Sequence, residues 1–300
     1  MSSTYILVSG DQRIGDLVSL AEGTTSTAVV VGPRAVADDV AASGVDAVVW
    51  LGEPTPGLPA EAYAPAVAAL VAQARPDLVL ASTRPGDRVL AGTAAAALGA
   101  PAFTLVTAVT VAEGAVELTR AVFGGIAQRT ERVTGPAVVV VDGGPAVVGG
   151  SAPVTEVAAE PTTTVTVVES RAGDRAGVDL SRAARIVTAG RGVRAQDDLG
   201  LVDALAGALD AESACSRPLA EGLGWYAHDR YVGVTGQHVA PDLYVAVGVS
   251  GQLQHAVGAR GAGTVVVINS DKDCPYFAEA DYCVVGDLYG VLPALTEALS

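Results

Sequence analysis

The chain has 300 residues and a formal net charge of −15, and 50% of its residues are hydrophobic. This length and apolar content provide for two domains with buried cores and argue against a disordered protein. Division at Gly173 leaves −8 and −7 on the two halves, so neither half offers the basic surface that binds DNA or RNA.

Apolar runs alternate with alanine-rich segments in the amino-terminal half. Strands are expected at residues 5–8, 28–31, 47–51 and 78–80, and a helix is expected at residues 61–75. This alternation is typical of βαβ units, in which helices connect the parallel strands of one sheet.

No catalytic motif is seen in this half. Arg84, Asp87 and Arg88 form a charged cluster before a helix. Capping and solvation are the simplest account of this cluster, and contact with a ligand or a partner is the alternative. The glycine pairs at residues 124–125 and 143–144 are expected in turns between strands.

The pattern changes after residue 102. Strand-like segments at residues 103–111, 115–125 and 136–144 are separated by short turns that contain glycine. This arrangement suggests antiparallel or mixed strands added to the same sheet. A last strand at residues 163–168 is expected to close the domain.

Residues 169–183 contain Gly, Asp and Arg without hydrophobic periodicity, and they are the best candidate for a linker. We therefore predict an α/β protein with an amino-terminal domain at residues 1–172 and a second domain at residues 173–300. Each domain is expected to be a mainly parallel sheet flanked by helices, and the second to be doubly wound. Strands of the second domain are expected at residues 185–188, 243–249, 264–268 and 282–285.

The stretch APDLYVAVGVSGQLQH, residues 240–255, places an almost continuously apolar strand directly before a small, polar segment. Ser250 is a good helix N-cap, and Gly251 would let a ligand approach the backbone closely. The free N–H groups and the positive end of the helix dipole would then bind an anion. An ordinary βα turn capped by Ser250 is the alternative, because short glycine motifs often match by chance.

Further polar and glycine residues follow the other predicted strands. Gly190–Gly192 come after the first strand of this domain, Asn269 follows the third, and Asp287 follows the fourth. Ligands bind beyond the carboxyl ends of the strands in such sheets, so one rim would bring these residues and residues 250–255 together.

Six motifs occur in a fixed order along the second half. The motifs are GRG at residues 190–192, ACSR at 214–217, YVGVTG at 231–236, VAPDLYVAVGVSGQLQH at 239–255, VINSDKDCPYF at 267–277 and ADYCVVGDL at 280–288. In this order and spacing they resemble the carboxy-terminal signature of the electron transfer flavoprotein alpha subunit family.

The resemblance implies a Rossmann-like domain that binds FAD. Arg217 would lie over the isoalloxazine ring, where its charge favours the reduced flavin. Thr235 would hydrogen-bond the ring near its redox-active nitrogen, and His255 would meet the pyrimidine edge as a donor or a positive charge. The ordinary alternatives are a surface salt bridge for Arg217, a turn position for Thr235, and a hydrogen-bonded position in the core for His255. The predicted cofactor-binding residues are Arg191, Ser216, Arg217, Val232, Gly233, Val234, Thr235, Gly236, Ser250, Gly251, Gln252, Leu253, Gln254, His255, Asn269, Asp287 and Leu288.

The remaining contacts divide along the dinucleotide. Residues 250–254 would bind the pyrophosphate or ribityl groups, and Asn269 and Asp287 would hold the adenosine end. A carboxylate repels phosphate and accepts hydrogen bonds from ribose hydroxyls, which suits Asp287 to the nucleoside.

The sequence also departs from the family pattern. The usual QVGQTG is YVGVTG here, so Tyr231 and Val234 replace two amides. The preceding loop is one residue longer and contains Trp225, Tyr226 and His228, and Ser270 replaces the usual lysine. These changes leave the redox potential and the set of partners open.

The function implied by the resemblance is electron transport, without bond chemistry on a substrate and without catalytic residues in this chain. The partners implied are a beta-type subunit in a heterodimer, often holding AMP, flavoprotein dehydrogenases as electron donors, as in fatty acid beta-oxidation, and a membrane-bound quinone oxidoreductase as acceptor. The amino-terminal domain is expected to contact the beta-type subunit. A flavin-dependent oxidoreductase acting on a small molecule and a structural subunit that has lost flavin are the alternatives.

Other classes of site have little support. Cys215, Cys274 and Cys283 form no CxxC pair, and with His only at positions 228, 238 and 255 we expect no metal site. No apolar run reaches the length that spans a bilayer, and a cytoplasmic protein is expected.

Overall fold

The computed structural model describes residues 2–112, 114–123, 126–162, 167–169 and 179–299. The chain divides into two compact units, Met1–Ser170 and Arg171–Ser300. The predicted domain boundary between residues 172 and 173 lies outside the described residues. Most of the predicted strand at 163–168 and the first part of the predicted linker also lie there.

Strands of the first unit form a mainly parallel sheet within the described residues, in the order β10-β3-β2-β1-β4-β9-β5. The four strands predicted in the first 80 residues are confirmed, each within three residues at either end. The apolar runs of β1, β2 and β4 are buried on both faces, as expected for central parallel strands, whereas β3 alternates between buried and half-buried residues. The strands are β1 (Ser3–Ser9), β2 (Thr25–Val31), β3 (Ala47–Trp50), β4 (Leu78–Ser82), β5 (Ala102–Thr104), β9 (Ala137–Val141) and β10 (Val154–Glu156).

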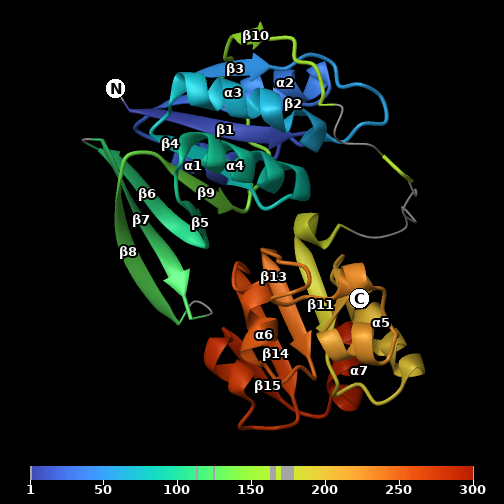
Figure 1. Ribbon diagram of the computed structural model, residues 1–300. Coiled ribbons are helices and arrows are strands. Elements are labelled where there is room, and N and C mark those ends of the chain that lie inside the picture. The colour runs from blue at the N-terminus through green and yellow to red at the C-terminus, as the bar shows by residue number, and fades with distance from the viewer. Residues whose placement is uncertain (1, 113, 124–125, 163–166, 170–178, 300) are drawn as a thin grey trace. The chain divides into compact units, whose positions relative to one another are not determined.

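Helices cover both faces of this sheet (Figure 1). Helices α1 (Gly15–Leu20) and α2 (Arg34–Ala41) pack on one face, and α3 (Ala64–Ala74) and α4 (Pro85–Leu98) pack on the other. The helix predicted at residues 61–75 is confirmed as α3 with a preceding 3-10 turn, Ala60–Tyr63. Helix α4 begins with a proline and ends at Gly99 in the left-handed conformation, as helix-end preferences lead one to expect.

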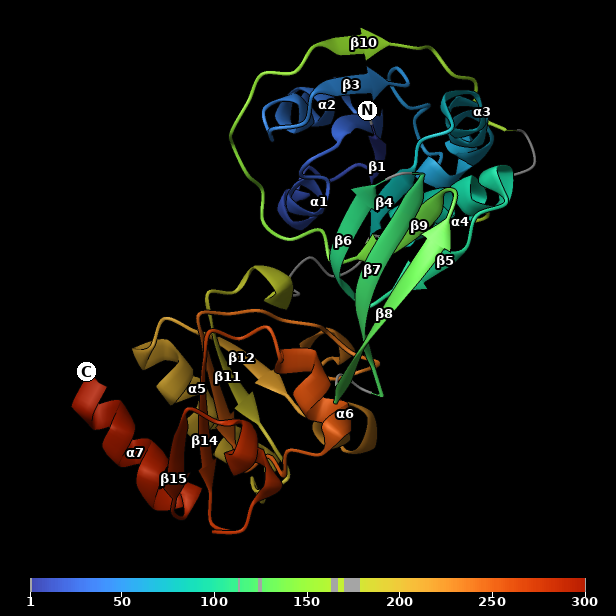
Figure 2. The same ribbon diagram turned by 90° about the vertical axis from the view of Figure 1, so that its left-hand side faces the viewer.

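Three antiparallel strands form a separate sheet, β6-β7-β8 (Figure 2). Antiparallel or mixed strands added to the main sheet are predicted here. The addition is confirmed for β5 and β9, which come from the first and third predicted segments, and it is wrong for β6 and β7. Leu105 has a φ of 58°, in the left-handed region, and so redirects the chain between β5 and β6. The segment at 136–144 instead supplies β9, which pairs in parallel with β4 and β5. The strands of the separate sheet are β6 (Val106–Ala112), β7 (Ala115–Val122) and β8 (Ala127–Thr134).

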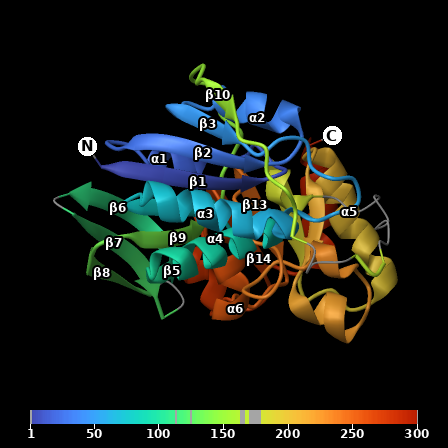
Figure 3. The ribbon, with the colours of Figure 1, turned by 45° about the horizontal axis from the view of Figure 1, so that its top comes forward.

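The second unit is a doubly wound parallel sheet in the order β12-β11-β13-β14-β15. Helices α5 (Leu199–Ala208) and α7 (Leu288–Leu299) pack on one face, while the short α6 (Leu253–Ala256) and neighbouring 3-10 turns cover the other (Figure 2; Figure 3 shows α5 and α6 from another side). The four predicted strands are confirmed, and β12 is additional. The strands are β11 (Arg185–Ala189), β12 (Glu212–Cys215), β13 (Leu243–Val247), β14 (Thr264–Asn269) and β15 (Tyr282–Val285).

Single helical turns connect these elements at Leu180–Arg182, Gln196–Asp198, Pro218–Gly222, His228–Arg230, Val257–Ala259 and Pro275–Glu279. None of the helices in the described residues has the length and apolar character required to cross a membrane.

Candidate functional site

The predicted residues of the second unit lie at one edge of its sheet. Arg191 follows β11, Ser216 follows β12, Ser250 follows β13, Asn269 ends β14, and Asp287 follows β15. All five strands are parallel, so these positions share the carboxyl edge. The strand order reverses between β11 and β13, and the crevice at such a switch point is where open α/β sheets bind ligands.

Glycines allow the two loops at the switch point to touch. The Gly192 amide donates to the carbonyl of Gly248 at 3.0 Å, and the Gly190 amide donates to that of Val247 at 2.8 Å. A Cβ on Gly190 would lie 2.3 Å from the Gly248 oxygen, and a Cβ on Gly192 would lie 2.7 Å from the Gly248 Cα. The close contact between the two loops therefore requires glycine at both ends of the GRG motif.

A small cavity of about 70 Å³ opens beside this crossing. It brings together Asn269 and Asp287, which the sequence assigns to the adenosine end, with Leu288, another predicted cofactor contact. Asp287 is exposed, whereas the Asn269 amide donates to the Val249 carbonyl at 3.0 Å. The cavity is lined by Gly192, Arg194, Gly248, Ile268, Asn269, Ser270, Gly286, Asp287 and Leu288.

Two residues at this cavity and its margin are missed by the sequence analysis. The Arg194 guanidinium lies 3.7 Å from the Asp287 carboxylate and 4.7 Å from the ring centre of Tyr289. The Tyr289 hydroxyl accepts from the Arg194 amide and donates to Asp198. The position of Arg194 two residues after the GRG motif is the one sequence signal that points to it.

The loop after β13 differs from the prediction. Helix α6 begins at Leu253 with Gln252 as N-cap, and it has only four residues, so the proposed capping role of Ser250 is wrong. A helix this short supplies little dipole for an anion. A Cβ on Gly251 would lie 2.2 Å from the Cβ of Tyr276, so packing against Tyr276 explains this glycine.

Arg217 lies at the surface, and its charge is paired. Its Nε lies 2.5 Å from Glu221, whose other oxygen lies 3.3 Å from His228 Nε2. The hydrogen bond with Glu221 raises the pKa of Arg217, and the same bond lowers the pKa of Glu221. The guanidinium is therefore charged, with a carboxylate as its immediate neighbour.

The YVGVTG loop connects this group to the loop after β13. The Tyr231 ring meets His228 edge-on at 5.9 Å, and its hydroxyl lies 2.9 Å from the Thr235 hydroxyl. The Val234 amide donates to the Gln254 carbonyl at 2.7 Å. A continuous set of contacts therefore joins the predicted ring contacts Arg217 and Thr235 to the segment that contains His255.

His255 is buried, with 7% of its surface exposed. Its Nε2 lies 2.9 Å from the Tyr244 hydroxyl, and its Nδ1 has no hydrogen-bond partner among the described residues. Burial lowers the pKa of His255 to about 4, although the Val232 backbone acts in the opposite direction. The imidazole is therefore neutral at neutral pH. Of the two roles predicted for His255, it can act as a hydrogen-bond donor to the flavin but does not supply a positive charge.

The other predicted residues differ in exposure. Ser216 is buried, and its amide donates to the Ala189 carbonyl at 2.9 Å. Beside it, burial raises the pKa of Cys215 to about 12, so this thiol stays protonated. Val232, Gly233 and Leu288 are buried, whereas those exposed at the surface are Arg191, Val234, Thr235, Ser250, Gln252, Leu253 and Gln254.

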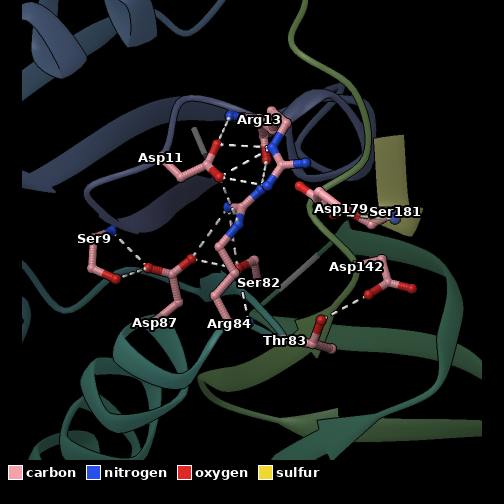
Figure 4. Close-up of polar contacts among 10 residues, drawn as sticks. All are labelled: Ser9, Asp11, Arg13, Ser82, Thr83, Arg84, Asp87, Asp142, Asp179 and Ser181. Atoms are coloured by element: carbon pink, nitrogen blue, oxygen red, sulfur yellow. Dashed lines mark hydrogen bonds and ion pairs between the residues drawn. The ribbon is translucent and has the colours of Figure 1, made fainter. Parts of the chain in front are cut away.

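The charged cluster of the first unit fills the corresponding switch point, between β1 and β4 (Figure 4). Asp87 is completely buried and accepts hydrogen bonds from Ser9 and Ser82, so its expected solvation is wrong. Arg84 lies 3.3 Å from Asp11 and donates to the Arg13 carbonyl. The chain's own ion pairs occupy the place where a ligand would bind.

The fold defines a two-domain α/β protein whose second domain is doubly wound, with its candidate site at the carboxyl rim. Residues 18–170 match the electron transfer flavoprotein domain, and residues 179–260 match the electron transfer flavoprotein FAD-binding domain. The chain belongs to the electron transfer flavoprotein alpha family.

Individual relatives agree with this assignment. The chain is 39% identical to the electron transfer flavoprotein subunit YdiR of Escherichia coli K12, over 80% of this chain and 79% of that protein. It is 36% identical to the protein FixB of Salmonella typhimurium LT2, over 98% of this chain and 94% of that protein.

Proposed function

We propose that this chain is the FAD-carrying subunit of a heterodimeric electron carrier. It accepts electrons from flavoprotein dehydrogenases, such as those of fatty acid beta-oxidation, and passes them to a membrane-bound quinone oxidoreductase or an equivalent acceptor. The proposal includes a cytoplasmic location. The observation that carries it is the match to the family's FAD-binding domain, with the predicted contact loops following the strands of one sheet edge.

The residues of this rim fit a dinucleotide. At one end, the exposed Asp287 carboxylate suits ribose hydroxyls and the backbone of the GRG loop lies beside the cavity. At the other end, Thr235 offers an exposed hydroxyl and Arg217 an exposed cation. The flavin would supply the electron transfer, and the protein would supply binding, orientation and electrostatics.

The neutral His255 adds a further point of fit. A buried polar atom without a hydrogen bond of good geometry is costly in a folded protein. Among the described residues Nδ1 makes none, although the Val232 backbone lies near enough to the ring to affect its pKa. Donation from a neutral imidazole to the pyrimidine edge of the flavin would satisfy it. This role needs a small movement of the ring or of the loops that cover it.

The first unit would contact the beta-type subunit, which would hold AMP. Phe123 directly follows β7 and Ile126 directly precedes β8, and their side chains are 81% and 74% exposed. Large exposed apolar side chains at one place are typical of protein contact surfaces. The name of the relative YdiR describes it as a subunit, which agrees with assembly.

Co-expression with the beta-type subunit tests the function. The purified heterodimer should be yellow, contain one FAD, and be reduced by a flavoprotein dehydrogenase and its substrate. An Asp287→Ala variant should hold less FAD, while Asp242→Ala, at an exposed position directly before β13 and thus at the opposite edge of the sheet, should keep it. A colourless heterodimer would reject the proposal, and turnover of a small molecule without any dehydrogenase would indicate an oxidoreductase instead.

A further inference from the structure

Tyr231 is the first residue of the YVGVTG loop. Its side chain is buried, with 2% of its surface exposed, and its hydroxyl lies 2.9 Å from the hydroxyl of Thr235. Thr235 itself is exposed on the rim. A buried phenol therefore contacts the one hydroxyl that this loop presents to a ligand.

The loop holds the phenol ring in a fixed position. A Cβ on Gly233 would lie 2.9 Å from the Tyr231 Cε2, and a Cβ on Gly236 would lie 2.7 Å from its Cδ1. The Gln237 amide donates to the Tyr231 carbonyl at 2.7 Å, so the loop closes around the ring. Larger residues at these two positions would collide with the aromatic ring.

The backbone anchors the same loop to the sheet and to the loop after β13. The Val232 amide donates to the Cys215 carbonyl at the end of β12, at 3.0 Å. On the other side, the Val234 amide donates to the Gln254 carbonyl. The hydroxyl oxygen of Tyr231 is thus held in a fixed position relative to the carboxyl edge of the sheet.

Either hydroxyl can donate in this pair, and because a phenol is a stronger proton donor than an aliphatic alcohol, donation from Tyr231 to the Thr235 oxygen is favoured. The Thr235 proton is then free to point outward. Donation to the Thr235 oxygen also polarises its O–H bond, because hydrogen bonds in a chain strengthen one another. Val234 has no polar side chain to compete for the same ligand atom.

We propose that Tyr231 is a positioning residue that makes Thr235 a hydrogen-bond donor toward the redox-active edge of the flavin. This inference rests on the proposed function and adds a residue that influences the redox potential. An anionic flavin reduced by one electron is more electron-rich than the oxidised ring and still accepts a hydrogen bond at its redox-active nitrogen, so Thr235 would donate most strongly to that form. Tyr231 would therefore stabilise the one-electron-reduced form relative to the oxidised form and raise the potential of the first electron.

A Tyr231→Phe variant tests the pair, because it removes one oxygen and retains the packed ring. We expect unchanged FAD content and a three- to tenfold loss in the equilibrium between reduced and oxidised flavin. A tenfold loss in a one-electron step corresponds to about 59 mV. Tyr226→Phe is the matched control: the Tyr226 hydroxyl is buried without a hydrogen-bond partner among the described residues, so its loss should leave the potential unchanged.

A double-mutant cycle separates coupling from a general structural effect. Tyr231→Phe should have no further effect on the potential in a Thr235→Ala background, whereas a Thr235→Ser variant should retain the dependence on Tyr231. Equal shifts in the wild-type and Thr235→Ala backgrounds, or an unchanged potential in Tyr231→Phe, would overturn the inference. Absence of FAD from the wild-type heterodimer would instead reject the proposed function.

Discussion

The charge of Arg217 is balanced by a neighbouring carboxylate, and this pairing bears on any flavin beside it. Glu221 lies within one helical turn and also contacts His228 from the longer loop. A guanidinium next to the ring favours the reduced flavin, and a carboxylate beside that guanidinium opposes the effect. The electrostatic effect on a flavin therefore depends on Arg217 and Glu221 together.

A Glu221→Gln variant should therefore raise the midpoint potential of the bound flavin. We expect a shift on the order of 30 mV, about threefold in a one-electron equilibrium. The shift should shrink at high salt, because both side chains are exposed and their fields are screened. Reductive titration of the heterodimer measures it.

Glu279→Gln is the control for this change. Glu279 pairs with Arg260 at 3.7 Å, away from the YVGVTG loop in the sequence, so its neutralisation should leave the potential unaltered. An equal shift in both variants, or no shift in Glu221→Gln with FAD still bound, would remove Arg217 from the vicinity of the ring.

His255 makes the stability of the second unit depend on pH. Its pKa falls from an ordinary 6.5 to about 4 in the folded state, so the unfolded chain binds the proton first as the pH drops. Stability should be fully present above pH 6.5 and decline toward pH 4. At 1.36 kcal/mol for each pKa unit, the loss approaches roughly 3 kcal/mol.

NMR titration of the imidazole and urea denaturation at several pH values measure the effect. A His255→Gln variant should lose this part of the pH dependence, and His238→Gln, at an exposed position, should keep it. An imidazole that titrates near pH 6.5 in the folded protein would contradict the prediction.

The sequence predicts which loops carry the site better than it predicts what each side chain contacts. Asn269 and Asp287 follow recognisable apolar strands, so their place on the rim is derived from the pattern alone. Contacts such as Arg194 with Tyr289 join residues 95 positions apart and require the three-dimensional fold. The buried state of His255 likewise depends on Tyr244 and Tyr276, which come from different elements.

At the scale of elements, predictability follows the apolar content of a strand. Strands β1 and β13 have apolar runs and are found from the sequence, and so is the exposed edge strand β15, whose sequence is YCVV. Strands β8, β10 and β12 are missed because polar residues interrupt their apolar pattern, which is tolerated at the sheet edges where they lie. The start of α6 is also misjudged, since the backbone after Ser250 follows the contact of Gly251 with Tyr276.

The contact between the loops after β11 and β13 gives a sharp test at this scale. Gly192→Ala should force these loops apart, because its Cβ would lie 2.7 Å from the Gly248 Cα. We expect a loss of about 1–3 kcal/mol in stability, as for other overpacked sites, and reduced FAD content. Thermal unfolding and flavin absorbance measure the two effects.

Gly207→Ala provides the matched control in the same unit. Gly207 lies exposed in α5 with open space around the position of a Cβ, so alanine should stabilise the helix by about 0.5–1 kcal/mol. If Gly192→Ala were as well tolerated as Gly207→Ala, the close backbone contact at the switch point would be refuted.

At the scale of the whole molecule, the hydrophobic core is divided between the two units. Two clusters of buried residues lie within the first unit, on the two faces of its sheet, and two lie within the second. Each unit therefore has the buried surface of an independent domain. The conformational stability of one should respond little to a substitution in the core of the other.

Calorimetry of the full chain should accordingly show two unfolding transitions. Asp87→Ala removes a buried carboxylate that holds β1 against β4, so it should lower only the transition of the first unit. Gly192→Ala should lower only the other transition, and added FAD should raise that same one, because a ligand stabilises the unit that binds it. A single transition that all three changes move together would show that the units unfold as one and that flavin binding involves both.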